Sequence, residues 1–232
     1  MDPLGEITVT VTVTYIIMSK PAIKEPQNEI VPNNSGGFEI TAEDIDIPRL
    51  NVVQAVSQID APHGSIVIDK RHVLAELETP ITTIPMVWTK GYREDKPFGM
   101  EPPSRSVYNK EDLDALKKDT EFPVIEFANI TLMFPEPEDA KGAGAYPFPI
   151  SGKNYAIGTL NVAKMAYSQT FKRLATYESL RSADDPAYNV FWNLEAITVE
   201  GRVTYFAPSL RVKATDDTPD KEVIAFINKF SK

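Results

Sequence analysis

Proline is the feature that most limits the folds open to this chain. The 232 residues include 19 prolines and 11 glycines. A proline breaks a helix interior, whereas strand ends, sheet edges and stiff loops tolerate it. The sequence therefore predicts many strand ends and rigid loops rather than long helices.

Segments rich in β-branched residues lie between groups of turn residues, and we expect each to be a strand. They cover residues 46–56, 64–69, 81–93, 124–134, 155–162, 189–199 and 202–212. Pro85 falls inside the third segment and predicts an edge or a bulge there. The last two segments are separated by Glu200 and Gly201, which predicts a hairpin with a two-residue turn.

Three segments have the capping residues or the spacing of helices. Asn109 is the expected N-cap of a helix over residues 110–118, with Asp112 at the third helical position. Apolar residues near helical spacing predict a longer helix over 164–181. A threonine followed by a proline, Thr218-Pro219, predicts the start of a last helix over 220–230. Because strands and helices do not alternate regularly, we expect a mainly β fold, a β-barrel with inserted helices.

The chain divides into three predicted parts. Residues 1–37 are polar or proline-rich over much of their length and predict a flexible N-terminal extension, within which we interpret residues 1–17 as lying ahead of a natural start at Met18. Residues 38–213 contain all the strands predicted above and form the predicted domain. Residues 214–232 contain the C-terminal helix, which we expect to pack on that domain.

Residue usage excludes several classes of function. The chain has no cysteine, which excludes disulfides, thiol catalysis and thiolate zinc sites. It has two histidines, His63 and His72, and we interpret both as surface or loop residues. No phosphate loop or metalloprotease motif occurs, and Ser151-Gly152-Lys153 lacks the glycine spacing of a phosphate loop. No apolar run is long enough for a membrane span. We therefore expect no enzyme activity, cofactor, metal or membrane.

Charge is distributed unevenly along the chain. The formal net charge is −9, yet residues 151–213 hold eight basic and five acidic groups, a net charge of +3. A polyanion would be repelled by the overall field and would have to find a local basic surface.

Basic residues interleaved with aromatic residues are the most informative pattern, because together they can hold phosphates and stack bases. Trp88, Lys90 and Tyr92 share one face of the 81–93 strand. Three sets carry the predicted nucleic-acid-binding residues, one on this strand and its extension, one on the long helix and one on the hairpin: Trp88, Lys90, Tyr92, Arg93 and Lys96; Lys164, Tyr167, Lys172 and Arg173; Arg202 and Tyr205. Arg211 and Lys213 also belong to the hairpin set.

The segment Asp46-Ile47-Pro48-Arg49-Leu50-Asn51-Val52-Val53-Gln54-Ala55 resembles the opening of a group of tailed-phage proteins. The strand at Ile81–Tyr92, the strand and helix at Tyr155–Leu180, Tyr188–Phe191 and Tyr205–Pro208 follow in a similar order. These proteins are taken to be single-stranded-DNA-binding proteins with an OB-fold core. The resemblance implies an OB-fold-like barrel of five antiparallel strands and sequence-tolerant binding of single-stranded DNA. It further implies a role in phage replication or recombination, with phage replication proteins as partners, in the host cytoplasm.

Two other readings stay open at this stage. A phage structural or accessory protein of the virion is compatible with the acidic charge and the abundant strands. A hydrolase or nuclease would have to use carboxylates, for which Glu43, Asp44 and Asp46 or the cluster near Glu136 are candidates. The sequence does not decide between DNA and RNA, and it leaves homo-oligomerisation open.

Overall fold

A computed structural model describes residues 46–97, 99–138, 140, 144–182, 185–201 and 203–230. The predicted extension, 1–37, and the first residues of the predicted domain, 38–45, lie outside the described residues. From Asp46 onward the chain forms one compact unit. Its elements are β1 (Arg49–Val52), β2 (Ile66–Ile68), β3 (His72–Ala75), β4 (Ile81–Glu94), β5 (Ser106–Val107), α1 (Lys110–Asp119), β6 (Val124–Pro135), β7 (Phe148–Ile150), β8 (Lys153–Ala163), α2 (Lys164–Gln169), α3 (Phe171–Leu180), a short 3₁₀ helix (Ala187–Asn189), β9 (Trp192–Val199), β10 (Tyr205–Val212) and α4 (Lys221–Phe230).

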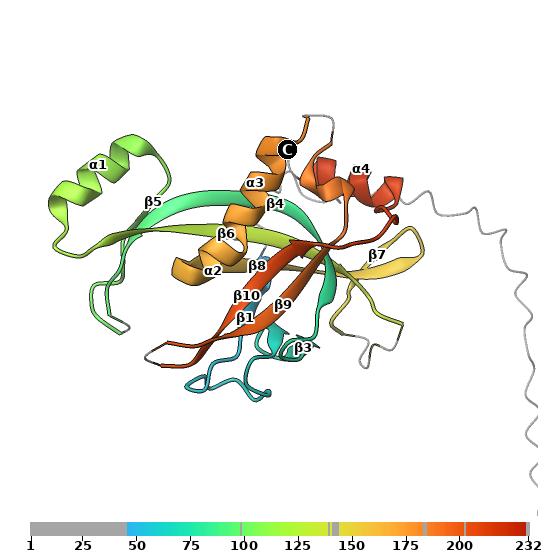
Figure 1. Cartoon of the computed structure of the whole chain (residues 1–232), viewed down its shortest axis with the longest axis horizontal. Coiled ribbons are helices and arrows are strands. Elements are labelled where there is room, and N and C mark those ends of the chain that lie inside the picture. The colour runs from blue at the N-terminus through green and yellow to red at the C-terminus, as the bar shows by residue number, and fades with distance from the viewer. Residues whose placement is uncertain are drawn as a thin grey trace, which may run out of the picture. The chain divides into compact units, whose positions relative to one another are not determined.

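The described strands form one mixed sheet that curls into a half-barrel (Figure 1). Its order is β10-β9-β4-β6-β8-β1-β2-β3, with β5 paired to β4 and β7 paired to β8. Strands β1 and β8 run parallel, and the other described pairs are antiparallel. The prediction of a mainly β fold with inserted helices is confirmed. The sheet is compatible with an OB-like barrel, but it has more strands than the five-stranded antiparallel barrel that the resemblance implies.

Strand β4 changes partner along its length, and this bends the sheet. Residues Ile81–Thr83 pair with β9, whereas Ile84–Glu94 pair with β6. The register shifts between Pro85 and Val87, because proline cannot donate a ladder hydrogen bond. The predicted bulge is therefore confirmed at Pro85.

A glutamine side chain joins the two sides of the curled sheet. The amide nitrogen of Gln54 donates to the carbonyl oxygen of Phe206 on β10 at 2.8 Å, and its amide oxygen accepts from the Phe206 N–H at 3.0 Å. This pair of bonds imitates a strand pairing. Gln54 lies just after β1 and close to the end of the segment that carries the resemblance.

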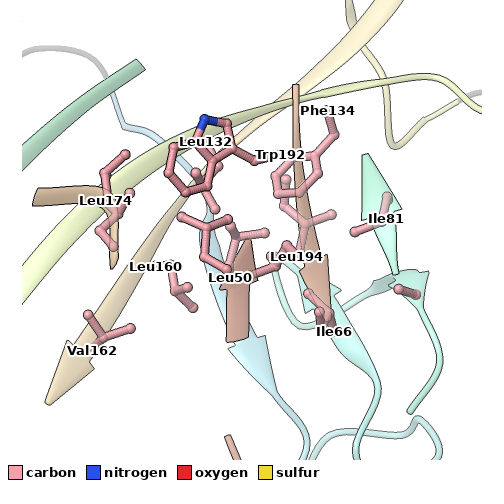
Figure 2. Packing of buried hydrophobic residues seen from close by; sticks show 14 of the residues in the cluster. Leu50, Ile66, Ile81, Leu132, Phe134, Leu160, Val162, Leu174, Trp192 and Leu194 are labelled. Atoms are coloured by element: carbon pink, nitrogen blue, oxygen red, sulfur yellow. The ribbon is translucent and has the colours of Figure 1, made fainter. Parts of the chain in front are cut away.

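Helices α2 and α3 pack on the inner face of the curled sheet. Tyr167, Phe171 and Leu174 on these helices belong to the same buried cluster as Trp192 and Leu194 on β9. Figure 2 shows Leu174 beside Trp192, with Leu50 and Leu160 below them. The helices are therefore fixed to the strands by the main core.

Helix α4 packs on the outer face of the same sheet. Its Val223 and Ile227 are fully buried and form a second cluster with Ile84, Met133 and Ile157. Strands β4, β6 and β8 thus carry apolar residues on both faces where helices cover them.

The predictions of helices at α1 and α4 are confirmed, but the prediction of a single helix over 164–181 is wrong. Asn109 caps α1, and its side chain accepts from the Asp112 N–H at 2.8 Å. The helix predicted over 164–181 is two helices, because Thr170 has φ −121° and ψ −80°. The apolar spacing continues across this break, so the spacing does not indicate it.

The predicted hairpin is present, but its two-residue turn is wrong. The last pair joins Val199 and Tyr205, so five residues connect β9 and β10. Strands β3, β5 and β7 and the 3₁₀ helix are not among the predicted elements.

Candidate nucleic-acid interface

The predicted face of β4 exists, but its tryptophan is not free. Trp88, Lys90 and Tyr92 pair with Ile130, Ala128 and Glu126 of β6, which places all three on one face. The Lys90 ammonium lies 5.2 Å from the centre of the Tyr92 ring. Trp88 is half-buried and packs against the main core, which leaves only part of the ring for a ligand.

Lys90 is exposed but has a carboxylate partner. Its ammonium donates to Glu126 on β6, and this hydrogen bond raises the pKa of Lys90 above its usual value. Tyr167 lies beside this pair and is 4% exposed. Burial, followed by the charge of Glu126, raises the pKa of Tyr167. Tyr167 is therefore a supporting residue of this surface rather than an open stacking ring.

Arg93 lies on the opposite face of the sheet from Lys90. Side chains alternate along a strand, so odd and even positions here face apart. Its guanidinium donates to Asn161 on β8 at 3.0 Å and lies 5.4 Å from the centre of the Phe127 ring. The structure therefore does not bring Arg93 together with Lys90.

Lys96 and Lys164 have local partners elsewhere. Lys96 is 7% exposed and pairs with the buried carboxylate of Glu94 at 3.1 Å. Lys164 pairs with Asp95 at 2.8 Å. The helix break separates Lys164 from Lys172, so the two do not share a face of one helix as the sequence predicted. Neither Lys96 nor Lys164 lines the hollows beside α3 that are described below.

Helix α3 supplies two predicted cations that have no ion-pair partner among the described residues. Lys172 is exposed, with its ammonium 5.9 Å from the centre of the Tyr167 ring. Arg173 is half-buried and donates to the Ser209 hydroxyl at 3.0 Å, to the Leu210 carbonyl at 3.4 Å and to Gln169. All these acceptors are neutral, so Arg173 has no direct ion pair among the described residues, and the carboxylate of Glu195 acts on it only from a longer distance.

The pKa of Arg173 reflects this environment. Burial, and then the neighbouring charge of Arg211, lower the pKa of Arg173. Arg211 lies on β10 with Glu195 at 3.7 Å as its partner. Two guanidinium groups held near each other form a site that an anion would stabilise.

The hairpin set is only partly on this surface. Arg202 lies outside the described residues. Tyr205 is 39% exposed at the opposite end of β10 from Arg211, about 20 Å away along the strand. Arg211 is part of the hairpin set, but the sequence analysis does not count it among the predicted binding residues. Its position near α3 depends on packing between segments that are distant in sequence.

Two shallow hollows flank α3 and share its exposed residues. One, of about 550 Å³, lies between α3 and β10 and is lined by Arg173, Arg211 and Val212 among others. The other, of about 620 Å³, lies toward β4 and includes Lys90. Lys172 and Leu180 line both. We call the surface formed by Lys90, Lys172, Arg173, Arg211, Leu180 and Val212 the cationic α3 surface.

The described residues contain no group of three or more histidine, aspartate or glutamate residues arranged to hold a metal ion. Asp46 is exposed, and Glu136 accepts a hydrogen bond from Asn154 at 2.8 Å. None of the described helices is long and apolar enough to cross a membrane.

Comparison with known proteins gives no relative: neither a family model, nor a curated protein, nor a solved structure matches this chain. The resemblance to phage single-stranded-DNA-binding proteins therefore stays a prediction. The case for a function rests on the geometry of the cationic α3 surface.

Proposed function

We propose that this protein binds single-stranded DNA without sequence preference, without catalysis, on the cationic α3 surface. One observation carries the proposal: cations from β4, α3 and β10, which are distant in sequence, line two hollows that adjoin along α3. Among them, Lys172 and Arg173 have no carboxylate partner in the described part of the chain. In a chain of net charge −9, such a surface suits a polyanion.

The same surface offers places for bases. Leu180 is 80% exposed and Val212 is 43% exposed, and both line the hollow that Arg173 and Arg211 border. Apolar contact with a base tolerates any sequence, while the cations hold the phosphates on either side. Tyr92, half-buried beneath Lys90, is the aromatic residue of the β4 set that we place here.

The biological setting follows from the resemblance alone. If the chain acts as the resembling phage proteins are taken to act, the bound strand is an intermediate of replication or recombination in the host cytoplasm, and phage replication proteins are its partners. The geometry supports the ligand class rather than this setting.

Titration of labelled dT25 by fluorescence anisotropy, at 50 and 200 mM salt, tests the proposal. With about three phosphates neutralised, the affinity falls about twentyfold between the two salt concentrations. The double variant Lys172→Ala/Arg211→Ala weakens binding and lowers the slope of log Kd against log salt by about 1.4.

The matched control removes the same charge elsewhere. Lys117→Ala/Lys118→Ala changes two exposed lysines of α1 and should leave the slope unchanged. Equal effects of the two double variants would mean that only total charge matters. Absence of salt-sensitive binding up to about 100 µM, with the protein assembling or entering virions instead, would favour the structural alternative. A parallel titration with rU25 decides between DNA and RNA.

A further inference from the structure

The outer face of the sheet is apolar under α4 and polar beyond it. Past the cluster around Met133, the outward positions of β4, β6, β8 and β1 include amides, hydroxyls and guanidinium groups, beside apolar residues such as Phe127. The polar residues are Arg49, Thr89, Arg93, Asn129, Thr159 and Asn161. No outward position of these four strands is acidic, although acidic residues outnumber basic ones 33 to 24 in the chain. We call this surface the open outer face.

Hydrogen bonds order the polar groups across three strands. Arg93 donates to the Asn161 side-chain oxygen at 3.0 Å, and the Asn161 amide nitrogen donates to Asn129 at 2.7 Å. The hydroxyls of Thr131 and Thr159 are 3.2 Å apart. Because Arg93 and Asn129 hold N–H groups beyond those used in these bonds, the face offers donors to an acceptor-rich ligand.

An exposed aromatic ring lies beside these donors. Tyr108 is 58% exposed and meets Phe127 edge-on, with 5.6 Å between ring centres. Phe127 is 3% exposed and lies over Gly91, where a Cβ would approach its ring to 2.6 Å. Arg93 contacts the same Phe127 ring. An exposed tyrosine ring and a guanidinium therefore both contact the buried ring of Phe127.

We infer that single-stranded DNA continues from the cationic α3 surface onto the open outer face, where a base stacks on Tyr108 and Arg93 holds the adjoining phosphate. The inference rests on the proposed function. Strand β4 links the two surfaces, since Lys90 faces one and Thr89 faces the other. Between Val87 and Gly91 this strand pairs, among the described strands, with β6 alone, and its Thr89 and Lys90 are exposed, so its other edge there gives the DNA a place to cross. A ring, a guanidinium and neutral donors suit a nucleotide, and Asp95, which lies in the same hollow as Arg93 just beyond the end of β4, is paired with Lys164.

The test measures dT25 binding by the full chain carrying Tyr108→Leu or, independently, Arg93→Gln. Each variant should bind about tenfold more weakly, with an unchanged circular dichroism spectrum. Phe148→Leu, which removes a 38% exposed ring on β7, is the matched control and should change Kd less than twofold. Photocrosslinking of an iodouracil-substituted strand should place an adduct on Tyr108.

The outcomes separate this inference from the proposed function. If the wild type binds dT25 and Lys172→Ala/Arg211→Ala weakens binding, while the Tyr108 and Arg93 variants bind normally and no adduct forms at Tyr108, the inference is overturned and the proposed function stands. If the wild type does not bind dT25, both are overturned. If the Tyr108 and Arg93 variants lose affinity and the control does not, the inference is supported.

Discussion

Glu94 and Arg173 lie at the centres of two polar clusters that differ in how their charge is balanced. Glu94, 2% exposed, accepts from the Arg105 guanidinium at 2.8 and 3.1 Å, from the Arg105 N–H at 2.9 Å and from Lys96 at 3.1 Å. Arg105 also pairs with Asp119. Arg173 instead has only neutral hydrogen-bond acceptors, with the guanidinium of Arg211 and, at longer range, the carboxylate of Glu195 as the charges that act on it.

The presence of a carboxylate partner, rather than the number of cations, distinguishes basic residues that stabilise the fold from those that are available to a ligand. Lys96 and Lys172 are both lysines near aromatic rings, at 5.3 Å from Phe122 and 5.9 Å from Tyr167. The first has a buried carboxylate and the second has none in the described chain. Removing one partner of a buried ion-paired cluster destabilises the fold because it leaves a buried charge uncompensated, whereas a cation without an ion pair is available to an anion.

Removing the charge of Glu94 is the strongest way to break this contrast. Glu94→Gln leaves Arg105 and Lys96 without their shared carboxylate, and we expect the melting temperature to fall by about 10 °C. Thermal unfolding followed by circular dichroism measures this. Because Glu94 lies away from the cationic α3 surface, the affinity of the folded variant for dT25 should stay the same, and a parallel loss of affinity would show that the clusters are coupled.

The pH dependence of stability tests the same carboxylate in a second way. The hydrogen bond from the Arg105 side chain, followed by that from its N–H, holds the pKa of Glu94 well below its usual range. A depressed folded pKa stabilises the fold above the unfolded pKa of about 4.3, and that stabilisation is lost as the pH falls through the folded pKa. The difference in melting temperature between wild type and Glu94→Gln should therefore be constant from pH 7 to 5 and narrow below about pH 4. A constant difference down to pH 2.5 would contradict this account.

Arg173→Met should have the reverse pattern of effects from Glu94→Gln: stability should change little and the affinity for dT25 should fall. The variant keeps a long side chain but loses an unbalanced charge, so the free energy of unfolding should change by less than about 1 kcal/mol. The affinity for dT25 should fall about tenfold, the loss expected for one hydrogen bond to a charged phosphate. Anisotropy and chemical denaturation measure the two effects.

Arg181→Met is the matched control for that variant. Arg181 follows the same helix but pairs with Asp185 at 2.5 Å, so its loss should change Kd less than twofold. Equal losses of affinity in the two variants would remove the distinction between balanced and unbalanced arginines.

Local patterns predicted most of the fold, and contacts between distant segments account for what they missed. The Asn109 cap depends on residues three positions apart, and Pro85 acts through its own missing N–H. The bond between Gln54 and Phe206 joins residues 152 positions apart, and no spacing in the sequence indicates it. The break at Thr170 has no proline or glycine at or beside it in the sequence.

The site divides in the same way. Alternation along a strand correctly placed Lys90 with Tyr92, and the same rule would have placed Arg93 on the other face had its odd position been used. Lys96 pairs with Glu94, whose carboxylate is buried and also pairs with Arg105. The sequence does not indicate that residues 94 and 105 meet. The nearness of Arg211 to Arg173 likewise depends on β10 packing beside α3, which a single sequence does not indicate.

The smallest expected effect comes from freeing a cation that is only weakly paired. Glu195 lies 3.7 Å from Arg211 in an exposed pair, and such pairs contribute about 0.2–1 kcal/mol. Glu195→Gln should therefore leave stability nearly unchanged and tighten dT25 binding about twofold at 50 mM salt, with the gain shrinking at 200 mM. Asp220→Asn frees Lys153, its partner at 3.8 Å, which lines neither hollow beside α3; the charge change is the same, so anisotropy should show no comparable gain. A gain of equal size in both variants would mean that the overall field of the protein, rather than the counter-charge at Arg211, sets the affinity.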